Sequence, residues 1–310
     1  MTKIAFVFPG QGAQKVGMGK TAHDAFDASR DIFRAADDAL GEDLSRLCFE
    51  GPDEALRLTA NTQPALLTTS IALLAALDEK PDVTAGHSLG EYSAHVCAGT
   101  LGFDDAVRIV RARGRYMQEA VPVGEGAMAA VMGLGADVVE EICAATDGIV
   151  EPVNYNCPGQ VVIAGSARAV AAAGPALVAA GGKVIPLPVS APFHSSLMRP
   201  AEERLEPHLR DTRMADPAVP VFVNVDATSV QTADAARTAL IRQVSRPVRW
   251  QASVERMIAD GVGLFVEIGP GRVLTGLIGR VARDSRRVNV QGPEDLESAR
   301  AAIASARAEG

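Results

Sequence analysis

Apolar and polar residues follow one another in blocks that predict a repeating order of strands and helices. A short, continuous apolar run at Ile4–Phe8 is typical of a strand that is buried on both faces, and Val219–Val225 and Leu264–Ile268 are predicted as further strands. Longer segments have apolar residues three or four positions apart, which is the spacing of an amphipathic helix. The predicted helices are Asp24–Leu40, Gln63–Leu77, Phe103–Val121, Leu197–Arg210, Thr232–Val244 and Gln251–Gly261. This alternation predicts an α/β fold with a mostly parallel sheet.

Residues 125–190 follow a different order. The pattern there is strand, helix, strand, strand, helix, strand, which is the ferredoxin-like arrangement. The segments are Ala127–Met132, Asp137–Ala145, Ile149–Tyr155, Gln160–Ala164, Ala167–Ala180 and Lys183–Val189. We therefore expect a large, α/β-hydrolase-like catalytic subdomain made of residues 1–124 and 191–310, with a small ferredoxin-like subdomain of residues 125–190 inserted into it. Catalytic groups are expected to line the cleft between the two.

Composition narrows the class of protein. The chain has 310 residues, 47% of them hydrophobic and 22% charged, as in an ordinary globular protein. Its formal net charge of -8 argues against nucleic-acid binding and gives no reason to expect a membrane surface. The longest apolar stretch, Ala65–Leu77, is too short to span a bilayer. The four cysteines form no C-x-x-C pair and have no metal-ligand spacing, so we expect a cytoplasmic protein with reduced cysteines and no metal.

Residues 86–90 read Gly-His-Ser-Leu-Gly, the G-x-S-x-G pattern of a nucleophile elbow. The residues before the pattern read as the end of a strand, and those after it as a helix closed by Gly99, which is the context that the motif requires. Glycine on both sides of the serine is expected because the turn is strained and tight. Ser88 is therefore the candidate nucleophile.

A serine hydroxyl needs a neighbouring base, normally a histidine, and the chain has five. His23 and His208 lie on predicted surface helices, and His95 lies two turns beyond Ser88, where packing is the expected role. His87 points to the opposite side of the strand end from Ser88. His194 remains, in a loop at the junction of the two predicted subdomains. No acidic residue near it is an obvious partner, so a backbone carbonyl is the alternative for orienting its ring.

The helix predicted at Phe103–Val121 carries four arginines. Arg108 and Arg115 fall well away from its apolar stripe, whereas Arg111 and Arg113 flank the stripe on opposite sides. Either of the flanking pair could reach a buried cleft and bind a carboxylate with its planar fork. A solvated role is the alternative for both, and helical geometry does not choose between them.

These features together resemble the malonyl-CoA:acyl carrier protein transacylases of bacterial fatty acid synthesis, which are related to the acyltransferase domains of polyketide synthases. The resemblance extends over nearly the whole chain and has the two-subdomain layout inferred above. The matching motifs are Phe8–Gln14, Gly86–Glu91, Arg113-Gly114 with Met117-Gln118, Asn154–Asn156 with Pro158–Gln160, His194, Gln243 ahead of Pro247-Val248, and Glu267–Gly271.

The resemblance implies a role for each matching residue. It makes Ser88 the nucleophile and His194 the general base and then the general acid. It implies that the backbone N–H groups of Gln11 and Leu89 form the oxyanion hole. It also selects Arg113 as the partner of the malonyl carboxylate.

Gln243 would support His194 through its main-chain carbonyl, which would account for the missing acid. Leu89 and Phe193 are similar to the malonyl-selective pattern of polyketide acyltransferases, in which a bulky residue leaves no room for an α-methyl group. The implied reaction is ping-pong malonyl transfer from malonyl-CoA to the phosphopantetheine thiol of an acyl carrier protein, with no metal or bound redox cofactor.

Three expectations concern partners and alternatives. A basic patch of Arg272, Arg280, Arg283, Arg286 and Arg287 is the candidate docking surface for the acidic carrier, with a solvated face as the alternative. We expect a monomer. The competing functions are a trans-acting polyketide synthase acyltransferase, a serine thioesterase or hydrolase with the same elbow, and a catalytically idle carrier-binding component.

Overall fold

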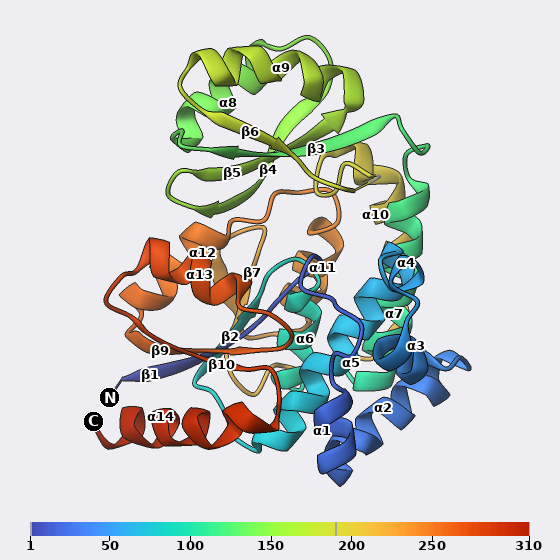
Figure 1. Ribbon diagram of the computed structural model, residues 1–310, viewed down its shortest axis with the longest axis vertical. Helices are drawn as coiled ribbons and strands as arrows, with labels where there is room; N and C mark the ends of the chain where they lie inside the picture. Colours follow the sequence, from blue (N-terminus) through green and yellow to red (C-terminus); the bar gives the residue numbers. More distant parts are fainter. Residues whose placement is uncertain (1, 190, 310) are drawn as a thin grey trace.

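The computed structural model describes residues 2–189 and 191–309, and Figure 1 shows them as two bodies stacked along the long axis. The larger body, here the large subdomain, is built on a six-stranded sheet in the order β10-β9-β1-β2-β7-β8. Its strands are β1 (Lys3–Phe8), β2 (Val83–Gly86), β7 (Val221–Val223), β8 (Thr228–Val230), β9 (Val262–Ile268) and β10 (Arg286–Val290). All neighbours are parallel except β7 and β8. The predicted α/β class is confirmed.

Helices cover both faces of this sheet. They are α1 (Lys20–Ala25), α2 (Asp27–Leu40), α3 (Leu44–Glu50), α4 (Asp53–Leu56), α5 (Thr59–Leu77), α6 (Gly90–Cys97), α7 (Phe103–Glu119), α10 (Arg199–Asp211), α11 (Ala233–Arg242), α12 (Trp250–Ala259), α13 (Val273–Val281) and α14 (Leu296–Ala308). Short 3-10 turns span Ser196–Met198 and Pro293–Asp295. No helix among the described residues is long and apolar enough to cross a membrane.

The continuous apolar run of β1 is explained by its two buried faces. Ile4, Phe6 and Phe8 pack with α5, α6 and α14 on one side of the sheet. Ala5 and Val7 pack with α12 and α13 on the other. Since successive side chains of a strand point to opposite faces, a central strand between two helical layers must be apolar at every position.

The small subdomain has its own four-stranded antiparallel sheet in the order β4-β5-β3-β6, which is the ferredoxin-like order. Its strands are β3 (Gly126–Met132), β4 (Val150–Cys157), β5 (Gln160–Ser166) and β6 (Lys183–Pro186), and its helices are α8 (Ala136–Ala145) and α9 (Ala167–Ala179). These elements all fall between Gly126 and Pro186. The exact subdomain boundaries drawn from the sequence, residues 125–190, stay a prediction, and Ser190 lies outside the described residues.

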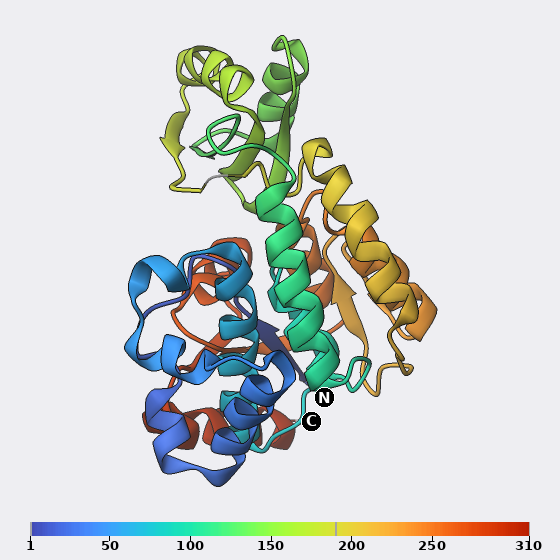
Figure 2. The same cartoon turned by 90° about the vertical axis from the view of Figure 1, so that its right-hand side faces the viewer.

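The chain enters the small subdomain from α7 and returns through α10, and Figure 2 shows these two helices side by side beneath it. Residues 187–189 and 191–194 therefore lie between the two bodies. Phe193 and His194 line a cavity there together with Ser88 of the large subdomain and Met128 of the small one.

Some of the predicted elements differ from the structure. The helix predicted over Asp24–Leu40 is two helices, because Phe26 adopts an extended conformation with φ -128° and ψ 128°. The polar segment after Arg280 gave no predicted element, yet it forms β10 and α14. The inward face of α14 consists mostly of alanine with Leu296 and Ile303, so its apolar stripe is weak in the sequence.

Candidate functional site

Ser88 lies in a sharp turn between β2 and α6. Its φ of 53° is in the left-handed region, which non-glycine residues rarely adopt. A Cβ on Gly86 would lie 2.0 Å from the carbonyl oxygen of Gly90, and a Cβ on Gly90 would lie 2.0 Å from the carbonyl oxygen of Phe8. The two glycines are thus required sterically, one by the turn itself and one by the close approach of β1.

His194 is hydrogen-bonded directly to this serine. Its Nε2 lies 2.7 Å from the Oγ of Ser88, and its Nδ1 donates to the main-chain carbonyl of Gln243 at 2.8 Å. Because a carbonyl only accepts, Nδ1 carries the ring proton, and Nε2 is left free to take the proton of the hydroxyl. Burial, with the nearby charge of Arg113, lowers the pKa of His194 to about 3, so the ring is neutral and able to act as a base.

Arg113, on α7, reaches the same serine from the other side. Its side chain is buried, and its Nη2 donates to the Oγ of Ser88 at 3.2 Å and to Oε1 of Gln243 at 2.8 Å. Its Nη1 donates to Oε1 of Gln63 at 2.9 Å. No carboxylate lies within ion-pair distance of this guanidinium among the described residues, so its charge is available to an anionic ligand.

Arg111 has a different environment. It donates to the side chain of Asn61 and pairs with Glu42 at 2.7 Å, and 20% of its side chain is exposed. The two arginines that flank the apolar stripe of α7 therefore have different environments in the structure. Arg113 lies in the site, and the solvated alternative fails for it.

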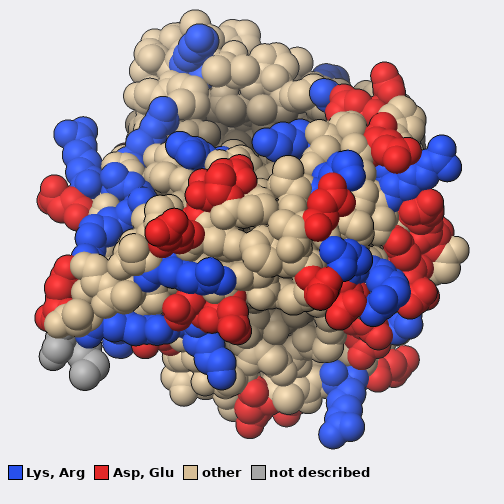
Figure 3. Space-filling view, turned by 60° about the horizontal axis from the view of Figure 1, so that its bottom comes forward, with Lys and Arg blue, Asp and Glu red and all other residues tan. Residues whose placement is uncertain are grey.

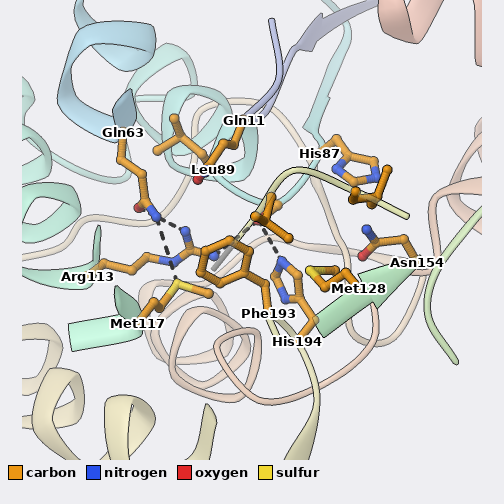
Figure 4. A pocket seen from close by; sticks show the side chains of 13 residues that line it. Gln11, Gln63, His87, Leu89, Arg113, Met117, Met128, Asn154, Phe193 and His194 are labelled. Atoms are coloured by element: carbon orange, nitrogen blue, oxygen red, sulfur yellow. Dashed lines mark hydrogen bonds between the residues drawn. The ribbon is translucent and has the colours of Figure 1, made fainter. Parts of the chain in front are cut away.

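A cavity of about 110 Å³ lies above Ser88, and Figure 4 shows the side chains around it. Phe193 and His194 lie side by side there, and Arg113 with Gln63 lies across from His87 and Asn154. The lining also includes Gln11, Leu89, Met117, Met128, Leu187 and Val189. The cavity is small, mostly apolar and has one cationic wall.

Gln11 and Leu89 are placed to offer backbone donors to this cavity. Among residues 2–189 and 191–309, neither of their N–H groups donates a hydrogen bond within the protein. The loop that carries Gln11 lies against the elbow, since a Cβ on Gly10 would come within 2.4 Å of the carbonyl oxygen of His87. Two free N–H groups next to a nucleophile are the usual composition of an oxyanion hole.

The other four histidines lie away from the Ser88 hydroxyl. His87 bonds Asn156 at 2.9 Å through Nε2, and His95 is fully buried. His23 bonds Asp24, and the exposed His208 bonds the hydroxyl of Tyr116. Of the five, the structure brings only His194 to the serine, as the elimination from sequence predicted.

Sequence reasoning missed three residues of the site, namely Glu91, Asn224 and Gln63. Glu91 follows the elbow directly, and its carboxylate is buried beside it. Asn224 follows β7, the strand next to β2, and the carboxyl ends of neighbouring parallel strands meet at one edge of a sheet. The position of Asn224 at that edge could have identified it from the sequence. Gln63 lies within an apolar helix, and no sequence pattern marks it as a site residue.

The arrangement supports acyl transfer through a covalent intermediate. It has a nucleophile, a neutral base held by a carbonyl, two free N–H donors and a buried cation that can bind a carboxylate at the far end of a short acyl group. The described residues contain no group of three or more His, Cys, Asp or Glu side chains that could hold a metal ion.

Comparison with known proteins identifies relatives over almost the whole chain. The acyl transferase domain family matches residues 5–303. The malonyl CoA-acyl carrier protein transacylase of Escherichia coli K12 is 51% identical over 288 residues, covering 91% of this chain and 93% of that protein. The enzyme of the same name from Bacillus subtilis is 48% identical over 309 residues, covering 96% of each chain.

A solved structure is similar to the same extent. It is a malonyl-transacylase in complex with the holo form of a type II polyketide synthase acyl carrier protein. The two chains superpose with a TM-score of 0.93 at 46% identity, covering 96% of this chain and 99% of the other.

Proposed function

The chain belongs to the acyl transferase family, and we propose that it moves the malonyl group of malonyl-CoA to the phosphopantetheine thiol of an acyl carrier protein. The observation that carries this proposal is the position of Arg113, a buried guanidinium 3.2 Å from the nucleophilic oxygen. A buried cation needs a counter-charge, and a malonyl group attached at Ser88 has a carboxylate within reach of it. The relatives named for malonyl transfer support the same substrate.

The first half of the reaction forms a malonyl-serine. The Oγ of Ser88 attacks the thioester carbonyl while Nε2 of His194 takes the hydroxyl proton. The carbonyl oxygen becomes an oxyanion that accepts from the N–H groups of Gln11 and Leu89, and losing one such donor typically costs about 3 kcal/mol. When the C–S bond breaks, the coenzyme A thiolate leaves and takes the proton from His194.

The second half repeats these steps in reverse with a new thiol. His194 removes the proton of the phosphopantetheine thiol, whose sulfur attacks the malonyl-serine carbonyl, and Ser88 leaves with that proton. The two substrates react in turn, which gives ping-pong kinetics. The malonyl group is a thioester both before and after the transfer. The reaction therefore runs near equilibrium and calls for no metal or bound redox cofactor.

Gln243 supports this chemistry at two of its atoms. Its main-chain carbonyl accepts from Nδ1 of His194 and stabilises the ring when it becomes charged. Its side-chain oxygen accepts from Arg113, which holds the guanidinium toward the cavity. A single residue thus orients the base and the carboxylate-binding cation.

The carrier docks, in this proposal, on exposed arginines at α13. Figure 3 shows Lys and Arg side chains gathered on the side of the large subdomain where Figure 1 places α12 and α13. Arg272, Arg280 and Arg283 are exposed there. Arg286 pairs with Glu309, Arg287 donates to the carbonyls that close α13, and both are only partly exposed. Arg280 donates to Oε1 of Gln160 at 3.3 Å but stays exposed. We therefore limit the proposed docking patch to Arg272, Arg280 and Arg283.

We also propose that the enzyme acts as a monomer.

A second candidate pathway has support from one observation. The similar solved structure is bound to a carrier protein of a polyketide synthase, so this chain can be the trans-acting acyltransferase of such a system as well as an enzyme of fatty acid synthesis. The chemistry at Ser88 is the same in both. A serine hydrolase is the weaker alternative, because Arg113 and Gln243 serve an anionic acyl group and not a water molecule.

Intact mass spectrometry tests the proposal directly. Brief exposure to malonyl-CoA should add one malonyl group, absent from Ser88→Ala, and addition of holo acyl carrier protein should move that group to the carrier. Loss of the group to water instead would indicate a hydrolase. The absence of any adduct would leave only a carrier-binding component without activity.

A further inference from the structure

Glu91 is a buried carboxyl group for which the mechanism above has no use. It lies in the first turn of α6, immediately behind the elbow, and is fully buried. One of its oxygens, Oε2, accepts from the backbone N–H of Asn224 at 2.8 Å and from Nε2 of Gln243 at 2.9 Å. The other oxygen, Oε1, has no hydrogen-bond partner among the described residues. A carboxyl group at such a place calls for an explanation, because its burial is costly.

The two residues that Glu91 holds also bind the backbone of the nucleophile. Oδ1 of Asn224 accepts from the N–H of Ser88 at 2.7 Å, and its Nδ2 donates to the carbonyl of Gly86 at 2.7 Å. Nε2 of Gln243 donates to the carbonyl of Ser88 at 2.9 Å. Both backbone groups of the serine are therefore bound by side chains, and those side chains come from two separate segments, after β7 and after α11.

The left-handed backbone of Ser88 makes this support necessary. A φ of 53° costs a non-glycine residue free energy that surrounding contacts have to offset. The contacts that offset this cost come from Asn224 and Gln243, and both of these residues donate to Oε2 of Glu91. Through Gln243 the same oxygen also influences His194 and Arg113, since that residue accepts from both.

We propose that Glu91 is a positioning residue of the transfer reaction, in which Oε2 fixes Asn224 and Gln243 and thereby the Ser88 turn, the His194 ring and the Arg113 guanidinium. The inference rests on the proposed malonyl transfer, which supplies the reaction that is measured. Glu91 touches neither substrate nor the reacting atoms. Its effect is to hold five other groups in place: Asn224, Gln243, the Ser88 turn, the His194 ring and the Arg113 guanidinium.

This role requires a hydrogen-bond acceptor at the position of Oε2 and does not require a negative charge. Burial raises the pKa of Glu91 to about 7, against the lowering effect of its bonds to Gln243 and Asn224 and of the Arg113 charge. A proton on this carboxyl group would sit on the unpartnered Oε1, and Oε2 would still accept both bonds. Glutamine can reproduce that arrangement, whereas aspartate keeps the charge but withdraws the oxygen by one methylene.

The test compares Glu91→Gln with Glu91→Asp by steady-state kinetics and by the rate of malonyl-Ser88 formation. We expect Glu91→Gln to keep kcat within about threefold of the unmodified enzyme and Glu91→Asp to lose about 30-fold or more in kcat, with a smaller change in KM for malonyl-CoA. Glu267→Asp is the matched control. Glu267 is equally buried, on β9, and accepts from the first N–H groups of α13, away from Ser88. It should lose thermal stability and keep kcat.

Equal activity of Glu91→Asp and the unmodified enzyme would overturn the inference. So would a Glu91→Gln enzyme as slow as Glu91→Asp, because the charge or the packing would then be the property that matters. If Glu91→Asp does not fold, a folded Glu91→Gln with unchanged kcat still supports the acceptor role, and a folded but inactive one excludes it. Failure of the unmodified enzyme to form malonyl-Ser88 would instead refute the proposed function.

Discussion

Nη2 of Arg113 lies 3.2 Å from Oγ of Ser88, although α7 and the elbow come from different layers of the large subdomain. The fold itself therefore places this cation beside the nucleophile. The same Nη2 also donates to the neutral side-chain oxygen of Gln243, Nη1 donates to that of Gln63, and Nε has no hydrogen-bond partner among the described residues. An acyl group that carries its own carboxylate can complete this environment, whereas a neutral acyl group leaves the buried charge unpaired.

Replacement of Arg113 by alanine should therefore change acyl selectivity. We expect the ratio of kcat/KM for malonyl-CoA to that for acetyl-CoA to fall about 100-fold, because a charge-assisted bond worth about 3 kcal/mol is lost with malonyl alone. Acetyl transfer should survive or improve. Parallel measurements with both thioesters give the ratio.

Arg111→Ala is the control for this substitution. It removes an arginine from the same helix, whose partners are Asn61 and Glu42 and not the site. Its selectivity should stay unchanged. An Arg113→Ala enzyme that loses malonyl and acetyl transfer equally would show that the arginine is structural.

The sequence identified those site residues that chemistry alone selects. It did not identify those whose position depends on how the helices pack. Ser88 followed from a motif with steric requirements, and His194 followed because the other histidines lay on surfaces, in the core or on the wrong side of the turn. The choice between Arg111 and Arg113 did not follow, since both flank the apolar stripe of α7 equally. Which flank faces the elbow depends on how α7 packs against α5 and α10, and that is a tertiary property.

The same limit explains the elements that were missed. The continuous apolar run of β1 predicts a strand because both of its faces are buried. The stripe of α14 is mostly alanine, which contributes little to an apolar pattern although it packs well against β1. Glu91 and Asn224 were missed for a related reason. Their importance comes from bonds between distant segments, which no local pattern records, although the shared strand edge was a usable signal for Asn224.

Phe193 is expected to limit the size of the acyl group. Its ring lines a cavity of about 110 Å³ beside Met117 and Met128, which leaves little space for an α-methyl group. Exclusion of one methyl group is worth about 1 to 3 kcal/mol. Phe193→Ser should thus raise the ratio of kcat/KM for methylmalonyl-CoA to that for malonyl-CoA by about tenfold. An unchanged ratio would refute the assignment.

Carrier docking can be separated from the chemistry by charge reversal. Arg280→Glu with Arg283→Glu should raise KM for the acyl carrier protein about tenfold, leave KM for malonyl-CoA nearly unchanged and weaken the salt dependence of the second half-reaction. The control for net charge is Arg30→Glu with Arg34→Glu, which reverses two exposed arginines on α2 that pair with Asp27 and Asp31. If this control raised KM for the carrier as much as the α13 variant does, docking at α13 would be excluded.

His95 gives a prediction about stability and pH. It is fully buried, and both of its ring nitrogens lack a hydrogen-bond partner among the described residues. Glu91 lies 4.0 Å away but forms no ion pair with it, because burial lowers the pKa of His95 to about 3 and keeps the ring neutral. The unfolded chain binds a proton at this residue below about pH 6.5, whereas the folded protein does not. The contribution of His95 to stability is therefore lost as the pH falls from 6.5 toward 3.

His95→Leu should remove this dependence. Leucine has a similar size and no unpaired polar atoms, so the variant should be more stable than the unmodified protein by about 1 kcal/mol at pH 7. The advantage should grow by about 2 kcal/mol between pH 6.5 and 5, since only the unmodified chain gains a proton at position 95 on unfolding. Urea unfolding at several pH values measures the difference, in which the titration of the distant groups shared by both proteins cancels. A constant difference across that range would mean that the His95 ring is protonated in the folded protein, with Glu91 as its partner.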